Sequence, residues 1–265
     1  MDMEHSLKRR VRQLARRRGK YGFDAPLVPF SLGIAAILLL VLGILGFFVF
    51  DIRLLGLLAL VCGFIFLLSA AGYVYTTSRG KFRVWAELLL QIGLRGDEEI
   101  LDMGCGRGAV LLMAAGLIHE GRAAGVDLWK SVDQSGNAEP VTLQNAGLEG
   151  VAERVELHTA DMQQLPFPEK SFDVVLSSLA IHNIPSSSGR DRAITEAVRV
   201  LKPGGKLVVV DFGGLTPNYA EHLRQLGMAD IVTRSLGWRF WYGGPWTASW
   251  LVSARSPLAA YRPGD

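Results

Sequence analysis

The sequence predicts an α/β domain with a mostly parallel sheet, carried on a helical hairpin of two membrane-spanning segments. Two uncharged apolar runs, Leu27 to Phe50 and Leu54 to Ser78, come first, and each exceeds the roughly 20 helical residues that cross a bilayer core. From residue 82 onward, strand-like and helix-like segments alternate, as is typical of strand–helix–strand units. We therefore divide the chain into a basic tail at 1–26, a hairpin at 27–78 and a folded domain at 79–265.

The link between the two apolar runs fixes their arrangement. Only Asp51 to Arg53 separate the runs, so the segments must turn back as a tight hairpin whose two ends face the same compartment. Basic side chains flank both ends, eight of them in residues 1–26 and three more at Arg79, Lys81 and Arg83. Such an excess marks cytoplasmic flanks, so we expect an integral membrane protein with both termini and the folded domain cytoplasmic. Buried core helices or a cleaved signal peptide fit less well, because two uninterrupted apolar segments follow each other directly.

The charge distribution restricts the partners of the two parts. The net charge of +3 comes from the tail, whose basic side chains we expect to set the topology and contact anionic lipid headgroups. Residues 79–265 carry slightly more acidic than basic side chains, so nothing there points to nucleic acid as a partner. The two cysteines are Cys62 in the second span and Cys105 in a glycine loop, which offers no disulfide framework and favours a reducing compartment.

Hydrophobic periodicity orders the elements of the domain. Apolar residues at helical spacing predict a lead-in helix at about 82–94. Strands are predicted at 98–103, 122–127, 154–159, 172–177 and 206–212, with helices at 108–119, 138–147, 190–201 and 217–227. Two final strand-like runs, at 229–236 and 247–255, are joined by an aromatic, glycine-rich segment.

The segment with the clearest chemistry is Asp102-Met103-Gly104-Cys105-Gly106-Arg107-Gly108, at the turn from the first strand into a helix. Glycines at such a turn let the backbone approach a ligand and aim the N–H groups of the helix start at it. The spacing of Gly104, Gly106 and Ala109 also satisfies the dinucleotide pattern, which makes a nicotinamide-dependent oxidoreductase an alternative. Asp102 favours a cationic ligand instead, because a carboxylate at this place would repel a pyrophosphate.

Two further carboxylates end the next two strands. Asp127 comes 19 residues after Gly108, where an acid can accept hydrogen bonds from both hydroxyls of a ribose. Asp161, followed by Met162, ends the third strand and can accept a hydrogen bond from an adenine amino group. Because ligands of open α/β sheets bind at the carboxyl ends of the strands, we expect these acids and Asp102 to border one nucleoside site.

In these blocks the chain resembles the class I S-adenosylmethionine-dependent methyltransferases, especially the branch that contains the ubiquinone and menaquinone C-methyltransferases. The resemblance runs from about 82 to 256 and includes further blocks at 165–167, 171–175 and 199–206. It implies a Rossmann-like sheet of seven strands with an antiparallel final strand, helices on both faces, and S-adenosylmethionine as the cofactor.

The resemblance also implies the residues that hold the cofactor. The glycine loop and Asp102 would bind its amino-acid part, Asp127 the ribose, and the end of the third strand the adenine, while Ser177 would contact the methionine part through its backbone. Cys105 fits as a small residue between glycines rather than as a nucleophile. The expected cofactor-binding residues are Asp102, Gly104, Cys105, Gly106, Gly108, Asp127, Leu128, Asp161, Met162 and Ser177.

His182, just beyond the fourth strand, is the candidate catalytic residue. An imidazole with an ordinary pKa of about 6.5 suits a general base, which is needed if the acceptor must lose a proton; packing or capping is the alternative. The aromatic residues from Trp238 to Trp250 can line an acceptor pocket, dock on lipid headgroups or pack the strand hairpin. His119, His158 and His222 lack ligand spacing, so no metal is expected.

These features predict a membrane-anchored methyltransferase that moves a methyl group from S-adenosylmethionine to a small-molecule acceptor, lipophilic or a lipid. The hairpin favours such an acceptor because it holds the pocket beside the bilayer. A protein-substrate methyltransferase is the first alternative. A non-catalytic membrane scaffold that only binds the cofactor is the second, and the complete set of glycines and strand-end acids argues against it.

Overall fold

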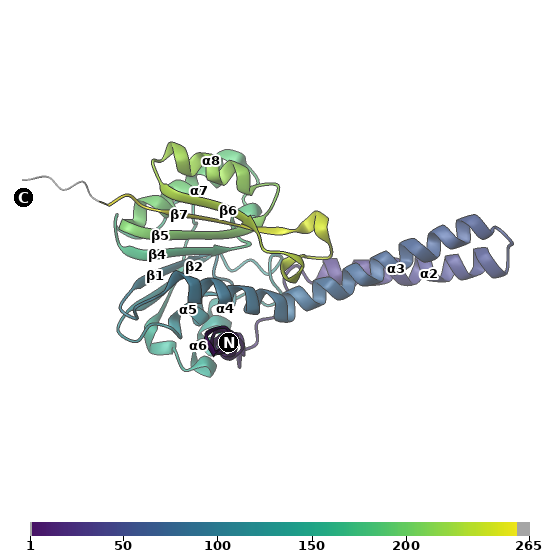
Figure 1. Cartoon of the computed structure of the whole chain (residues 1–265), viewed down its shortest axis with the longest axis horizontal. Helices are drawn as coiled ribbons and strands as arrows, with labels where there is room; N and C mark the ends of the chain where they lie inside the picture. The colour runs from purple at the N-terminus through teal and green to yellow at the C-terminus, as the bar shows by residue number, and fades with distance from the viewer. Residues whose placement is uncertain (1, 259–265) are drawn as a thin grey trace, which may run out of the picture.

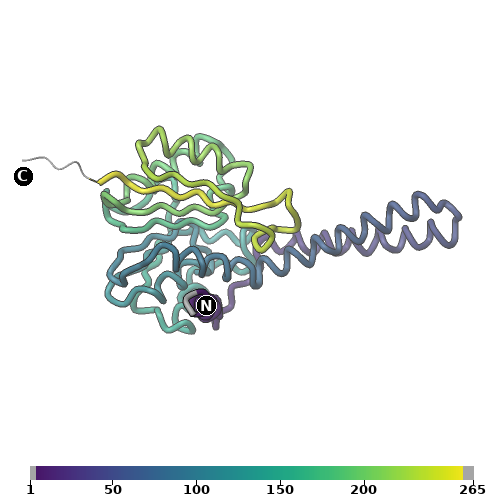
Figure 2. Tube along the Cα trace, in the orientation of Figure 1, coloured from purple at the N-terminus to yellow at the C-terminus, as the bar shows by residue number. Residues whose placement is uncertain are grey.

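In the computed structural model, a twisted sheet lies between two layers of helices, and a long helical hairpin projects from one side of it (Figure 1). The structure describes residues 2–258, so the end of the predicted domain, 259–265, lies outside the described residues. Both legs of the hairpin meet the domain, and the turn between them is far from it (Figure 2).

The sheet has the seven strands that the sequence predicts. They are β1 (Glu99–Met103), β2 (Arg122–Asp127), β3 (Val155–Thr159), β4 (Phe172–Ser178), β5 (Leu201–Phe212), β6 (Ala229–Ser235) and β7 (Ser249–Arg255). Their order is β3-β2-β1-β4-β5-β7-β6, and β7 runs antiparallel to both of its neighbours, which confirms the expected topology. Strands β1 to β3 are added toward one edge of the sheet, and the strands from β4 onward are added toward the other. Open α/β sheets bind their ligands at such a switch point, which here lies between the parallel strands β1 and β4.

Helices cover both faces of the sheet, as expected. On one face lie α4 (Lys81–Ile92), α5 (Leu111–Ala115) and α6 (Glu139–Glu149), and on the other α7 (Ser187–Val200) and α8 (Thr216–Gln225) (Figure 1). Short helical turns are η2 (Ala152–Arg154), η3 (Ile181–Asn183), η4 (Trp238–Phe240) and η5 (Pro245–Thr247). Leu89 and Leu112 belong to the core on the first face, and Ile194 and Leu223 to the core on the second.

Two predicted boundaries are wrong for local reasons. The helix predicted at 108–119 spans only α5, because the glycine loop continues to Val110 and the Asp102 carboxylate accepts the N–H of Leu111 at the helix start. The strand predicted at 206–212 begins earlier, at Leu201, because a register shift in the pairing of β5 with β4, between Phe172 and Val174, accommodates the additional residues.

The two apolar segments form α2 (Leu27–Phe48) and α3 (Arg53–Tyr75), which are long and apolar enough to cross a membrane by length and composition. Their backbones approach closely at glycines: a Cβ on Gly56 would lie 2.5 Å from the nitrogen of Phe47. One π-helical turn, η1 (Thr76–Gly80), joins α3 to α4, so a single helix runs from Arg53 to Ile92.

The predicted basic tail, residues 1–26, contains a helix and contacts the domain. The helix is α1 (Asp2–Leu14), whose Val11 is buried in the core of the domain. The guanidinium of Arg17 forms a 2.7 Å ion pair with Glu149, and the backbone N–H of Lys20 donates to Asn145. The apolar spacing of Val11 and Leu14 gives α1 a face that packs on the domain, while most of the basic side chains stay exposed.

Candidate functional site

A cavity of about 340 Å³ lies at the carboxyl ends of β1, β2 and β4. Its volume falls in the range of about 300–1,000 Å³ that is usual for small-ligand sites. The predicted residues that line it are Asp102, Gly104, Cys105, Gly106, Asp127, Leu128, Asp161, Met162 and His182. The structure thus brings the three strand-end acids and the candidate base to one cavity.

Asp102 is buried and has free acceptor capacity. Its Oδ2 accepts the N–H of Leu111 at 2.9 Å, whereas its Oδ1 has no hydrogen-bond partner among the described residues. Burial raises the pKa of Asp102 to about 7; the Leu111 N–H opposes this rise and the charge of Asp127 adds to it. A buried, unpaired carboxylate oxygen beside a cavity fits an ammonium group of a ligand.

The N–H groups of the glycine loop do not point freely into the cavity, contrary to our expectation. Gly106 donates to Asp127 Oδ2 at 2.8 Å, and Arg107 donates to Gln134 Oε1 at 2.8 Å. The N–H groups of Gly104 and Cys105 both donate to the carbonyl of Val126. Val126 and Asp127, the acceptors for three of these N–H groups, lie at the end of β2, and Gln134 comes from the connection between β2 and α6.

Asp127 and Asp161 also stabilise their own turns. Asp127 Oδ1 accepts the N–H of Trp129 at 2.6 Å and an amide N–H of Asn137 at 3.1 Å. Asp161 Oδ1 accepts the N–H of Gln163 at 2.8 Å. A carboxylate offers about four lone-pair sites, so Asp127, which also accepts the N–H of Gly106, keeps about one of them for a ligand hydroxyl, and Asp161 keeps at least one.

Two predicted residues do not line the cavity. The hydroxyl of Ser177 donates to the carbonyl of Met103 at 2.9 Å; neighbouring strand residues face opposite sides, so Ser178 lines the cavity instead. A Cβ on Gly108 would meet Leu112 at 2.8 Å, which shows that this glycine faces α5.

Cys105 lines the cavity as a neutral thiol. Burial raises its pKa well above the ordinary value, and the charges of Asp102 and Asp127 raise it further. A thiol nucleophile needs the opposite shift, so the geometry agrees with a packing role between the glycines.

His182, in η3, is paired with a residue that sequence reasoning missed. Its Nδ1 lies 2.8 Å from Oδ1 of Asp211, a fully buried residue in β5 that also accepts the backbone N–H of His182 and the hydroxyl of Tyr219. A carboxylate only accepts, so Nδ1 carries the proton and Nε2 is left with its lone pair. The signal in the sequence is an acid inside the apolar run of β5.

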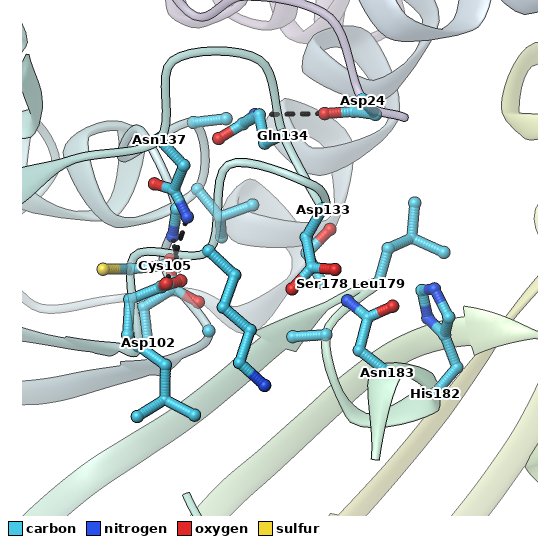
Figure 3. A pocket seen from close by; sticks show the side chains of 18 of the residues that line it. Asp24, Asp102, Cys105, Asp133, Gln134, Asn137, Ser178, Leu179, His182 and Asn183 are labelled. Atoms are coloured by element: carbon cyan, nitrogen blue, oxygen red, sulfur yellow. Dashed lines mark hydrogen bonds between the residues drawn. The ribbon is translucent and has the colours of Figure 1, made fainter. Parts of the chain in front are cut away.

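The cavity extends to the root of the hairpin, where Asp24 is a second residue that the sequence did not single out. Its carboxylate accepts from Lys81 at 2.7 and 2.8 Å, from the Tyr242 hydroxyl at 2.8 Å and from Gln134 at 3.0 Å. Burial acts to raise the pKa of Asp24, but Lys81 and these hydrogen bonds hold it below its ordinary value. Figure 3 shows Asp24 with Gln134 on one side of the pocket and His182 on another.

The aromatic residues between β6 and β7 divide into two groups. Phe240 and Tyr242 are buried in the core, and Tyr242 also lines the cavity. Trp238 and Trp246 are 63% and 69% exposed. Packing in the core therefore explains the first pair, whereas Trp238 stacks on Tyr75 of α3, with ring centroids 5.4 Å apart, and Trp246 stays exposed.

Comparison with known proteins agrees with this geometry. Residues 101–209 match the family described as a methyltransferase domain. The chain is 30% identical over 167 residues to 27-O-demethylrifamycin SV methyltransferase of Amycolatopsis mediterranei, covering 61% of this chain and 57% of that protein. It is 31% identical over 137 residues to the ubiquinone/menaquinone biosynthesis C-methyltransferase of Escherichia coli, covering 51% of each. The chain thus spans little more than half the length of these curated relatives.

A solved structure shows the same fold. Phosphoethanolamine N-methyltransferase 2 of Haemonchus contortus, in complex with S-adenosyl-L-methionine, aligns with a TM-score of 0.55 at 19% identity, covering 71% of this chain and 56% of that one. At this identity the likeness shows the fold alone. Together with the sequence matches, this likeness supports a methyltransferase domain around residues 101–209 with S-adenosylmethionine as its methyl donor.

Proposed function

We propose that this protein is a membrane-bound methyltransferase that methylates a small lipophilic acceptor at the cytoplasmic surface of the bilayer. The observation that carries the proposal is the extent of one cavity, bordered at one end by Asp102 and Asp127 and at the other by Asp24, Ala25 and Tyr73 at the hairpin root. The two curated relatives are named as a methyltransferase of 27-O-demethylrifamycin SV and as a C-methyltransferase of ubiquinone/menaquinone biosynthesis. Both names support a small acceptor.

Membrane insertion of the hairpin is supported by its length and its surface. At about 1.5 Å per residue, α2 and α3 are about 33 and 35 Å long, enough for a hydrocarbon core of about 30 Å. Large apolar side chains point outward, among them Leu27, Phe48 and Leu54, each more than 70% exposed. Water-soluble proteins rarely expose so continuous an apolar surface, whereas close glycine contacts inside the pair are typical of membrane helices.

The cofactor-binding residues fit S-adenosylmethionine. Asp102 Oδ1 would accept from the ammonium of its amino-acid part, because this oxygen is buried beside the cavity and has no partner in residues 2–258. Asp127 would hold the ribose and Asp161 the adenine amino group, with Met162 and Leu128 against the ring. When bound, S-adenosylmethionine supplies an electrophilic methyl group on a sulfonium centre.

His182 and Asp211 provide a base for the acceptor. Nε2 of His182 accepts the proton of the acceptor, and the buried Asp211 carboxylate orients the ring and stabilises the imidazolium that forms. Such a base is useful when the nucleophilic atom carries a proton, as in a hydroxyl, an amine or an acidified C–H. Asn183 lines the same side of the cavity.

The test uses the full chain in lipid nanodiscs with isotopically marked S-adenosylmethionine and a lipid extract of membranes. We expect mass spectrometry to find a marked small molecule in the lipid fraction, together with S-adenosylhomocysteine, and about 10²-fold slower formation of both with His182→Ala. Label only in protein would refute the small acceptor. Cofactor binding without any marked product, using extracts from several sources, would refute an enzyme and indicate a scaffold.

A further inference from the structure

We propose that the loop between β6 and β7, residues 237–248, is a third membrane element that inserts its tip, Gly243 to Trp246, into the bilayer beside the hairpin. The inference rests on the proposed membrane insertion of α2 and α3. It concerns an interaction surface with lipid that is independent of the chemistry in the cavity.

The loop follows α3 away from the domain and toward the hairpin turn. Successive loop residues contact positions ever farther along the helix: Arg239 lies against Gly80, Trp241 against Thr76, Tyr242 against Tyr73 and Gly243 against Ser69. A Cβ on Gly243 would lie 3.6 Å from the Ser69 carbonyl oxygen and 3.7 Å from Leu32 of α2. The tip therefore touches both membrane helices, and Figure 1 shows the loop reaching out along the hairpin.

The position of Ser69 sets the depth of the tip. The exposed Arg79 marks the headgroup level, and Ser69 lies ten residues before it, about 15 Å along the helix at about 1.5 Å per residue. The headgroup layer accounts for about 5–7 Å of this distance. The tip then lies about 8–10 Å below the hydrocarbon boundary, within the depth of about 5–10 Å that interfacial elements reach.

The composition of the loop suits this depth. No charged residue occurs from Phe240 to Ala254. The one basic residue in 237–248, Arg239, is paired with Glu87 at 2.7 and 2.8 Å. Trp238 and Trp246 are largely exposed in the described structure, and tryptophan is enriched at membrane interfaces.

The loop also satisfies much of its backbone internally, as lipid requires. The Thr247 hydroxyl donates to the carbonyls of Tyr242 and Gly244 at 2.6 and 3.1 Å, and the N–H of Thr247 donates to the Gly244 carbonyl. Pro245 at the tip has no N–H to satisfy. Because Tyr242 also lines the cavity, the inserted loop would form one wall of a path from the lipid to the cavity.

The experiment measures quenching of an environment-sensitive fluorophore by phospholipids brominated on the upper part of their acyl chains. The full chain is labelled at position 246 in Trp246→Cys, with Cys62→Ser in the background; Cys62→Ser alone reports labelling of the buried Cys105. The matched control is Glu221→Cys in the same background, an exposed site on α8. We expect about twofold or stronger quenching at position 246 and none at position 221.

Labelling of the native Cys62, in the middle of α3, separates this inference from the proposed membrane insertion of the hairpin. Quenching at Cys62 but not at position 246 overturns the loop insertion alone. Absence of quenching at both positions overturns the membrane insertion and the loop with it. Equal quenching at positions 246 and 221 also overturns the inference. Signal at position 246 that depends on protein concentration instead of brominated lipid would assign the loop to contact with a second copy.

Discussion

Replacing Asp102 with asparagine tests the electrostatics of the cofactor end of the cavity. Burial raises the pKa of Asp102 from 3.8 to about 7, so the folded protein holds this proton more tightly than the unfolded chain. The resulting stability is complete below the unfolded pKa and is lost as pH rises through about 7. The shift amounts to about 4 kcal/mol over the whole window, of which about 2 kcal/mol falls between about pH 5.5 and about pH 8.

Asp102→Asn stays neutral and keeps an acceptor for the N–H of Leu111, so the variant should lack this decline. The assay follows thermal unfolding of the cofactor-free protein in nanodiscs at both pH values. For a domain of this size, about 2 kcal/mol corresponds to about 4–8 °C in Tm. Between about pH 5.5 and about pH 8, the Tm of the wild type should fall by this amount more than the Tm of the variant does. The variant should also bind S-adenosylmethionine more weakly. Parallel pH profiles of the two proteins would refute a buried carboxylate with a raised pKa.

Three further predictions concern other parts of the chain. Asp127→Ala should weaken cofactor binding by about 1–3 kcal/mol in calorimetry, through lost hydrogen bonds to the ribose, and unchanged affinity would remove its assignment. His182→Ala should lower turnover by about 10²-fold or more with cofactor affinity nearly intact, and Asp211→Asn should shift the pH profile of turnover; normal kinetics in both would exclude the base. Gly56→Ala should lower the Tm because its Cβ meets the backbone of α2, whereas Gly72→Ala, with open space around it, should not; equal effects would contradict the close packing.

Much of the site follows from short-range patterns. Asp102, Asp127 and Asp161 each end a strand, and parallel strands deliver such residues to one edge, so the sequence alone predicts their meeting. Asp24 escaped prediction because its partners Lys81 and Tyr242 lie 57 and 218 residues away.

Other features depend on which side chains happen to face each other in the fold. Asp211 lies in an apolar strand, and only the folded chain shows that His182 is its partner. The N–H groups of the glycine loop are occupied in the described site by acceptors that the sequence did not indicate: Gln134, from a connection with no regular structure, takes the N–H of Arg107, and Asp127 takes that of Gly106. No local periodicity encodes these contacts.

The unbroken helix from Arg53 to Ile92 would fix the distance between the cavity and a membrane that contains the hairpin. Phe82 and Trp85 belong to this helix and line the cavity, so one continuous helix connects the wall of the cavity to the segment that we propose to span the membrane. A domain on a flexible linker would sample many heights above a bilayer, whereas a continuous helix inserted in the membrane would hold this domain at one height. Acceptors would then be selected by the depth of their reactive atom in the bilayer as well as by their shape. Only a molecule whose reactive atom lies at the depth of the cavity would meet the methyl donor.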